Sequence, residues 1–344
     1  MFGHWLAILV ADRYQSVCTH ENAEFAPCQL PMSVEATTEA IAKSIPGGEE
    51  VYRALVGLLA RSGLEYSGEF VEVDGFRVHY LDYGPRDSEL PPVVLMHGAG
   101  PGSGNWYSQI AILRETRRVI AMDSPLFGLS DLAEQDGHPT VSVARFLIKF
   151  LDVMGIVKAD FVGLSFGGAV ILTLAIDHPE RVRRLVLVDS AGLGRGIPYA
   201  WRLVHAPWLG TLLFKPSRFV RDRVFEKWEV RNPEMPDKEA YAEYSFAVRI
   251  RPGRSVPMKE GMKRFTSWLG QRRKFSNDEL RSVAPETLVM WGDDDRIFPL
   301  NHGERAARLI PIARLEVIEN AGHVCFWDQP ETTNRLLVDF LNAD

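Results

Sequence analysis

The feature that most constrains this chain is a repeated alternation of short apolar runs with longer helical patterns. Mostly apolar runs occupy residues 93–96, 119–122, 160–162, 185–188, 288–290 and 315–318, and helical spacing fills 141–154, 167–177, 302–310 and 331–341. Runs of this kind are typical of strands buried on both faces of a parallel sheet. The alternation therefore predicts an α/β fold with a mostly parallel, doubly wound sheet.

The segments before this sheet follow other patterns. Residues 70–73 and 76–81 are joined through Asp74-Gly75, a hairpin turn signal. Residues 33–44 and 49–61 have helical spacing and are separated by Pro46-Gly47-Gly48. We therefore expect a partly helical N-terminal extension over 1–68. The sequence leaves open whether the protein forms a homodimer through this extension. Because Met32 precedes Ser33, an N-cap residue type, we expect the first thirty residues to contribute little to the fold.

The strand pattern stops between Val188 and Thr287. This stretch contains helix-like pieces rich in Trp, Phe, Leu and Arg, and residues 191–275 include seven prolines that separate them. We predict a helical cap over 191–275, inserted into a core formed by 69–190 and 276–344. Such a cap would cover the carboxyl edge of the sheet, where open α/β sheets bind ligands.

Charge and composition narrow the function classes. The net charge of −6 argues against generic nucleic-acid binding, yet residues 191–275 carry 12 Arg and 6 Lys against 8 acidic residues. This excess indicates either a solvated helical surface or a site for an anionic substrate or an acidic partner. The apolar run at 5–11 is far shorter than the ~20 residues of a membrane span and has no basic residue before it. We therefore expect no membrane span and a cytoplasmic protein.

A nucleophile motif follows one of the predicted strands. Gly163-Leu164-Ser165-Phe166-Gly167 lies between the strand at 160–162 and a helical run. A strand–turn–helix of this form is the context of the nucleophile elbow, in which the residues two before and two after the serine must be small. Ser165 is the predicted nucleophile.

A base and an acid are expected from two later loops. His323 lies in Asn320-Ala321-Gly322-His323, between the last strand and the final helix, and is the best placed of nine histidines to take the serine proton. The loop at 291–299 supplies Asp295 as the acid that orients the imidazole, with Asp293 and Asp294 as turn residues. Asp189, at the end of an earlier strand, is the rival acid, because both fit the chain order Ser, Asp, His.

Backbone donors complete the predicted site. A tetrahedral intermediate needs N–H groups aimed at its oxyanion. We expect these from Phe166, the residue after the nucleophile, and from Ala99 in the loop 97–102. Gly98 and Gly100 let the backbone of that loop approach a substrate closely. This chemistry requires no cofactor, and the three cysteines have no metal-ligand spacing.

By its motifs the chain resembles the α/β-hydrolase superfamily from about Glu69 onward. The segments HGAGPGSGNW (97–106), DSPLFGLSD (123–131), WGDDDRIFPLNHG (291–303) and TNRLLVDFL (333–341) are similar to those of the carbon–carbon hydrolases of aromatic meta-cleavage pathways. In that family an asparagine precedes the nucleophile, a tryptophan follows the catalytic histidine, and a cap arginine holds the substrate carboxylate. The matching positions here are Leu164, Val324 and Tyr244, so we expect these side chains to contact substrate.

These three departures shape the functional prediction. A dienoate would be poorly held without its polar contacts, since unmatched buried charge is costly. We therefore favour hydrolysis of a small carboxylic ester by a serine esterase, through an acyl-enzyme. A carbon–carbon hydrolase with the same triad is the alternative. A ligand-binding receptor of the same fold is a third hypothesis, because fold alone does not give function.

Overall fold

The computed structural model describes residues 34–133, 136–206, 208, 210, 217–218, 228–232 and 235–343. These residues all fall in one compact unit, Val34–Asp344. The predictions made for the first thirty residues lie outside the described ranges.

An eight-stranded sheet forms the centre of this unit, with the strand order β1-β2-β4-β3-β5-β6-β9-β10. The first two strands form the predicted antiparallel hairpin, and β2 also pairs antiparallel with β4, whereas all other pairings of this sheet are parallel. The strands are β1 (Gly68–Val73), β2 (Phe76–Tyr83), β3 (Val93–Met96), β4 (Val119–Met122), β5 (Ala159–Leu164), β6 (Val182–Val188), β9 (Glu286–Gly292) and β10 (Ala313–Ile318). The predicted fold class is confirmed.

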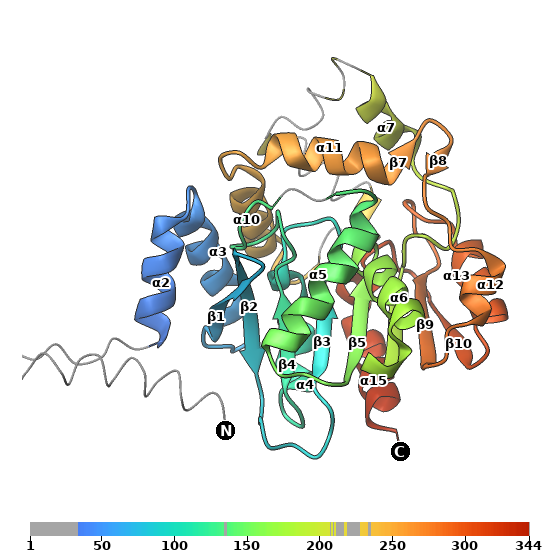
Figure 1. The fold of residues 1–344 in the computed structure, drawn as a ribbon, viewed down its shortest axis with the longest axis horizontal. Coiled ribbons are helices and arrows are strands. Elements are labelled where there is room, and N and C mark those ends of the chain that lie inside the picture. The colour runs from blue at the N-terminus through green and yellow to red at the C-terminus, as the bar shows by residue number, and fades with distance from the viewer. Residues whose placement is uncertain are drawn as a thin grey trace, which may run out of the picture. The chain divides into compact units, whose positions relative to one another are not determined.

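Helices cover both faces of this sheet (Figure 1). On one face of the sheet, a hydrophobic layer contains Phe161 of β5 and side chains of four helices. These are α5 (Pro139–Val153), α6 (Phe166–Asp177), α12 (Asn277–Arg281) and α13 (Asn301–Leu309). On the other face, Val162 and Leu164 pack with α4 (Tyr107–Leu113) and α15 (Pro330–Asn342). Because successive side chains of a strand point to opposite faces, the continuous apolar runs of the sequence supply both layers. Short helical segments complete the core: η1 (Ser103–Trp106), η2 (Pro179–Arg181) and α14 (Cys325–Asp328).

The two N-terminal helices belong to the core. They are α2 (Val34–Ser44) and α3 (Gly48–Ala60). Val51, Leu55 and Leu58 of α3 are fully buried in the same apolar cluster as Leu81 and Trp106. Residues 34–60 were predicted as part of an extension, and the structure instead includes them in the hydrophobic core, because their apolar stripe faces it.

The cap consists of α7 (Tyr199–Arg202), η3 (Leu203–His205), α10 (Lys238–Arg249), α11 (Ser255–Phe265) and a hairpin of β7 (Thr266–Ser267) and β8 (Gly270–Gln271). In Figure 1 these elements lie together beyond one end of the sheet strands. The hairpin was not predicted, since its strands are only two residues long and carry no alternating pattern. In the described part of the chain, no helix has the length and apolar character required to cross a membrane.

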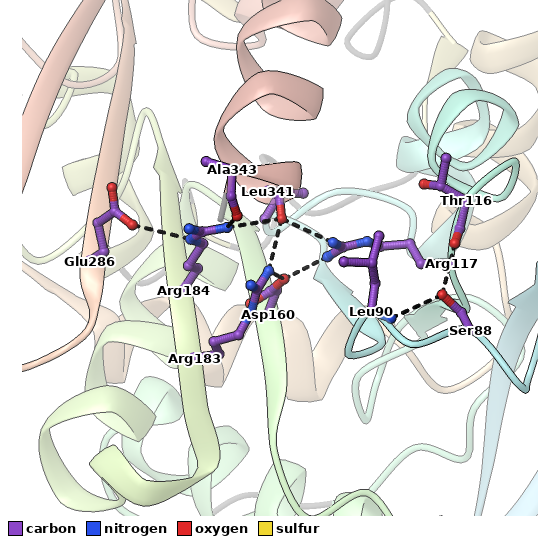
Figure 2. A network of polar contacts seen from close by, with 10 residues as sticks. All are labelled: Ser88, Leu90, Thr116, Arg117, Asp160, Arg183, Arg184, Glu286, Leu341 and Ala343. Carbon is purple, nitrogen blue, oxygen red and sulfur yellow. Dashed lines mark hydrogen bonds and ion pairs between the residues drawn. The ribbon is translucent and has the colours of Figure 1, made fainter.

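A charged network lies at the opposite, amino end of the strands (Figure 2). Asp160 of β5 is fully buried and accepts hydrogen bonds from Arg117 at 2.6 Å and from Arg183 Nε at 2.7 Å. The carbonyl oxygen of Leu341, near the end of α15, accepts from Arg117, Arg183 and Arg184 at 2.9, 2.8 and 3.1 Å. These contacts fasten the C-terminal helix to the edge of the sheet.

Candidate active site

The turn at Ser165 has the geometry of a nucleophile elbow. Ser165 follows β5 directly and has φ 53° and ψ −114°, a conformation that a non-glycine residue rarely adopts. A Cβ on Gly163 would lie 2.7 Å from the backbone of Gly167, and one on Gly167 would collide with the carbonyl oxygen of Met96. Both flanking positions must therefore be glycine for β5 and α6 to pack this closely.

Asp295 and His323 are brought together as predicted. His323 Nδ1 lies 2.9 Å from Asp295 Oδ2, and both side chains are buried. The other oxygen of Asp295 accepts from the backbone N–H groups of Ile297 and Phe298 at 2.7 and 3.0 Å. These two donors fix the carboxylate, which in turn fixes the imidazole ring and leaves Nε2 free to face the pocket.

Asp189, the rival acid, has a different environment. Its Oδ1 accepts from the N–H of Gly292 at 2.9 Å, and no histidine among the described residues bonds to it. Burial, followed by the negative charge of Asp295, raises the pKa of Asp189 well above its ordinary value. Asp189 therefore favours its neutral form more than an exposed aspartate does, and it joins the end of β6 to the end of β9.

The predicted oxyanion loop lies against the elbow. A Cβ on Gly98 would be 3.3 Å from Cβ of Ser165, so the loop backbone runs close beside the nucleophile. Ala99 and Phe166 both border the same hollow as Ser165. Phe166 is the first residue of α6, and its N–H therefore has no acceptor within the helix. His97 is fully buried and braces the loop, with Nδ1 2.6 Å from the Gly98 carbonyl oxygen and Nε2 accepting from the N–H of Ser124.

Two hollows meet at Ser165, under the cap. The first has a volume of about 220 Å³, and its polar lining side chains come from both the core and the cap. These are Asn105, Ser165, Glu229, Tyr241, Ser245, Arg249, Arg254 and His323. The second is about 50 Å³ and apolar apart from Ser165, with lining residues that include Leu126, Phe127, Phe166, Phe265 and Phe298. We call the first the polar hollow and the second the apolar hollow.

Ser165 and His323 both line the polar hollow. Among the described residues there is no direct hydrogen bond between these two side chains. Catalytic hydrogen bonds are often long in ligand-free enzymes and tighten when substrate binds. The arrangement provides a hydroxyl, an imidazole held by a buried carboxylate, and backbone donors around one pocket, which suits attack on a carbonyl carbon.

Four of the five predicted substrate contacts line the polar hollow, namely Gly98, Gly100, Leu164 and Val324. The structure differs from the prediction at Tyr244. This side chain is fully buried, its hydroxyl accepts from the N–H of Gly104 at 3.3 Å, and it borders neither hollow. Tyr244 thus supports the loop that carries Ala99 from behind.

Sequence reasoning missed the charged cap residues in the pocket. Glu229 lies beside His323, and its backbone carbonyl accepts from the N–H of Val324 at 2.9 Å. Burial raises the pKa of Glu229, opposed by the charges of Arg249 and His323. The excess of arginine in the cap was the available signal, but it does not specify which arginines point inward.

Arg254, at the start of α11, is the most buried of these cations. It donates to the carbonyl oxygens of Leu126 at 2.7 Å and Gly100 at 3.4 Å and lies over the ring of Phe127. No carboxylate of the described residues is within ion-pair distance of it. Burial, and then the nearby charges of Arg249 and Arg251, lower the pKa of Arg254 to about 9. A cation in this state gains stability from an anionic ligand.

Comparison with known proteins defines the class. The model of the α/β hydrolase fold family matches residues 91–330. The chain therefore belongs to the α/β-hydrolase fold family, and it is a hydrolase.

Curated relatives are more specific than the family. A 2-hydroxy-6-oxononadienedioate/2-hydroxy-6-oxononatrienedioate hydrolase from Comamonas testosteroni is 32% identical over 291 residues, covering 78% of this chain and 92% of the relative. A 2-hydroxymuconate semialdehyde hydrolase from Pseudomonas putida is 32% identical over 293 residues, covering 80% and 94%. A solved meta-cleavage product hydrolase from Pseudomonas fluorescens IP01 has a TM-score of 0.67 and 27% identity, with 80% of this chain and 97% of that one covered.

These relatives overturn the predicted carboxylesterase. They are named as hydrolases of 2-hydroxy-6-oxo acids and of a semialdehyde, which matches the alternative. A Bacillus subtilis carboxylesterase also has this architecture, but at 23% identity the likeness concerns the fold alone. The physical error lay in assuming that a missing arginine at position 244 means a missing cation, because Arg249 and Arg254 bring positive charge to the pocket from later cap positions.

Proposed function

We propose that this protein is a serine-dependent carbon–carbon bond hydrolase that cleaves 2-hydroxy-6-oxodienoates, the ring-fission products of meta-cleavage. The relatives support this reaction by their names. The observation that carries the proposal for this chain is a matched donor and acceptor in the polar hollow. Arg254 supplies an unpaired cation, and Asn105 supplies a buried Oδ1 that has no partner among the described residues.

These two groups lie around one residue of the oxyanion loop. Arg254 Nη2 is 3.4 Å from the carbonyl oxygen of Gly100, and a Cβ on Gly100 would be 3.6 Å from Asn105 Oδ1. A 2-hydroxy carboxylate presents an anion next to a hydroxyl donor. The cation of Arg254 suits the carboxylate, and the free acceptor of Asn105 suits the hydroxyl.

The apolar hollow suits the other end of such a substrate. Its lining is formed by aromatic, aliphatic and methionine side chains, among them Phe127, Phe265 and Met262. An uncharged substituent on C6 would be buried there at about 25 cal/mol per Å² of apolar surface. The carbonyl carbon between the two ends would then lie over Ser165, where the two hollows meet.

In the proposed mechanism Ser165 attacks the C6 carbonyl carbon while His323 accepts the hydroxyl proton. Asp295 holds the imidazole and stabilises its charged form. The N–H groups of Ala99 and Phe166 stabilise the oxyanion of the tetrahedral intermediate. Its collapse breaks the C5–C6 bond, the imidazolium returns the proton to the departing carbon fragment, and water then hydrolyses the acyl-enzyme on Ser165.

The leaving group explains why the cations matter. An ester releases an oxygen, which readily carries negative charge, whereas this substrate releases a carbon. The dienol must therefore first become its keto tautomer, in which the proton of the C2 hydroxyl has moved to C5. When the C5–C6 bond then breaks, its electron pair spreads through C4 and C3 onto the C2 oxygen, at the carboxylate end where Arg254 and Arg249 provide positive charge. The pocket cations thus serve both binding and bond cleavage. This chemistry needs no added cofactor, and we retain the predicted cytoplasmic location as part of the proposal.

Parallel assays on a coloured 6-phenyl dienoate and on p-nitrophenyl acetate test the proposal. The wild-type protein should cleave the dienoate with the higher kcat/KM. Arg254→Met should lower kcat/KM for the dienoate by roughly 10²-fold or more, because a charged contact is worth about 2–5 kcal/mol when its partner is buried. It should change the rate on the neutral ester little.

Two variants control this experiment. Ser165→Ala should abolish both activities and gives the background rate, and Arg272→Met removes an exposed cap arginine that does not line the pocket. The proposal fails if the wild type does not cleave the dienoate. It also fails if Arg254→Met reduces both activities equally.

A further inference from the structure

The cap carries several large apolar side chains that are mostly exposed, and the aromatic ones and Leu269 are the largest of them. Tyr199 is 80% exposed, Leu269 is 79% and Trp208 is 71%, and Trp268 is 55% exposed. Single exposed apolar residues are ordinary, whereas a group of them on one surface marks an interaction site. We call these four residues the cap patch.

Contacts between α7, η3 and the β7–β8 hairpin join three members of the patch into one surface. Arg202 lies 4.3 Å from the centre of the Tyr199 ring and donates to the carbonyl oxygen of Trp268 at 3.0 Å. The ring of His205 is 5.7 Å from that of Trp268. Trp268 and Leu269 form the turn between β7 and β8, at the tip of the hairpin. In Figure 1 this hairpin lies beside α7.

Basic residues surround the patch. The segment 255–275, which includes α11 and the hairpin, has six Lys and Arg against one acidic residue, Glu260. Arg272 and Lys274 are exposed just after the hairpin. Arg195 is exposed beside it, where its carbonyl oxygen accepts from the N–H of Gln271 at 3.0 Å. The surroundings of the apolar tips are therefore strongly cationic.

The patch also adjoins the pocket. Tyr199 belongs to the same short helix as Ala200 and Trp201, which line the polar hollow, and Trp201 lines the apolar hollow as well. Ala200 is exposed at the surface. The helix that carries Tyr199 thus contributes both to the exposed surface and to the lining of the substrate site.

We infer that the cap patch binds the surface of an anionic phospholipid bilayer. Trp and Tyr side chains favour the headgroup level of a membrane, leucine inserts below it, and Lys and Arg attract anionic headgroups. Protruding side chains on a hairpin tip suit insertion into a fluid surface. The charge alone would suggest an acidic protein as the binding partner. Charge attraction to such a partner gives no role to the exposed side chains of Trp268, Leu269 and Tyr199.

Binding of the full-length protein to vesicles tests this inference. It should cosediment with vesicles that mix phosphatidylglycerol with phosphatidylcholine, and binding should fall as salt rises because the attraction is screened. Replacing both hairpin-tip residues, Trp268→Ser with Leu269→Ser, should reduce partitioning about tenfold or more through lost apolar burial. Arg272→Gln with Lys274→Gln should weaken binding and flatten its salt dependence.

A matched control removes an exposed apolar residue elsewhere. Val157 is 78% exposed and precedes β5 at the other end of the sheet, so Val157→Ser should bind vesicles like the wild type. All variants should keep the wild-type melting temperature and the same rate on a water-soluble substrate, since none of these residues lines either hollow. Hydrolysis and vesicle binding are thus measured independently.

Three outcomes would overturn the inference. One is unchanged vesicle binding by the hairpin-tip variant, and another is equal binding to vesicles of phosphatidylcholine alone. The third is binding to soluble poly-glutamate but not to vesicles, which would assign the cap to an acidic polypeptide instead.

Discussion

The two ends of the parallel sheet both contain buried charge, and they use it differently. At the amino end, Asp160 is bonded to Arg117 and Arg183, and the same arginines also donate to the carbonyl oxygen of Leu341 (Figure 2). At the carboxyl end, the partners of Arg254 among the described residues are carbonyl oxygens and an aromatic ring, and Arg254 borders a cavity.

The difference separates a structural network from a binding site. A buried charge is costly unless another charge compensates it. The amino end provides that compensation within the protein, so its charges hold the fold together. At the carboxyl end the compensation for Arg254 must come from outside, and we attribute it to the substrate carboxylate. The two ends should therefore respond to mutation in opposite ways, one in stability and the other in turnover.

The largest expected effect concerns the two acids at the carboxyl end. Asp295→Asn should lower kcat about 10⁴-fold, because an amide cannot hold the imidazole in the required tautomer or stabilise its charge. Asp189→Asn should change kcat less than about tenfold, since Asp189 accepts from the N–H of Gly292 and bonds to no histidine of the described residues. Single-turnover kinetics on the dienoate measure both.

An equal loss of activity in the two variants would contradict this assignment. It would mean that Asp189 takes part in proton transfer, and that the hydrogen bond between Asp295 and His323 is not the functional one. Circular dichroism and melting curves must accompany the assay, because both acids are buried.

The next largest effect is expected from a substitution that breaks the amino-end network. Asp160→Asn leaves Arg117 buried without a counter-charge and should lower the free energy of unfolding by about 3–5 kcal/mol. Glu286→Gln is the matched control, because Glu286 is a half-exposed partner of Arg184 at 3.1 Å and such pairs contribute about 1 kcal/mol or less. Urea denaturation measures both.

The activity of folded Asp160→Asn protein should equal that of the wild type. A drop in kcat per folded molecule would show that the two ends of the sheet are coupled, and the contrast between them would no longer hold.

The smallest expected effect is a pH dependence of stability at the carboxyl end. Burial, the largest cause, lowers the pKa of His302 from 6.5 to about 4. Between these values the unfolded chain binds a proton that the folded protein does not, so stability should fall as pH drops from about 6.5 to about 4. His302→Gln should reduce that slope, although a slope from His138, whose pKa is also lowered to about 4, remains.

Exposed His178 provides the comparison for this variant. Urea midpoints at several pH values should show the same slope for His178→Gln as for the wild type. A wild-type stability that stays constant between pH 6.5 and 4 would mean that His302 is not held neutral in the folded protein.

Much of the fold could be read from local pattern. All eight strands of the main sheet were predicted, six of them from mostly apolar runs and two from a hairpin turn signal. The hairpin forms at Asp74-Gly75 because both residues adopt positive φ. Ser165, Asp295 and His323 were predicted as a triad because each follows a strand that ends at the same edge of a parallel sheet. Chain order and topology were sufficient to predict that Asp295 and His323 lie within hydrogen-bond distance and that Ser165 lines the same hollow as His323.

The cap could not be read in the same way. The sequence pattern around the cap arginines does not distinguish their environments. Arg254 lines the substrate pocket, Arg251 donates to the carbonyl oxygens of Gly128 and Ser130, and Arg272 is exposed. The expected contact of Tyr244 with substrate was wrong for the same reason. The face a helical residue presents depends on how the helix packs against the rest of the chain.

The sequence by itself determined the sheet, the elbow and the order of the nucleophile, acid and base, because these depend on apolar periodicity and on glycines that permit one backbone turn. Only the tertiary structure decided which charges are paired and which are left for a ligand. That distinction requires distances between residues far apart in the chain, such as Asn105 and Arg254 on either side of Gly100. A count of charges along the chain does not distinguish an arginine in a buried ion pair from an arginine in a binding site. The two arginines differ in their solvation and in their partners, and only the tertiary structure gives these.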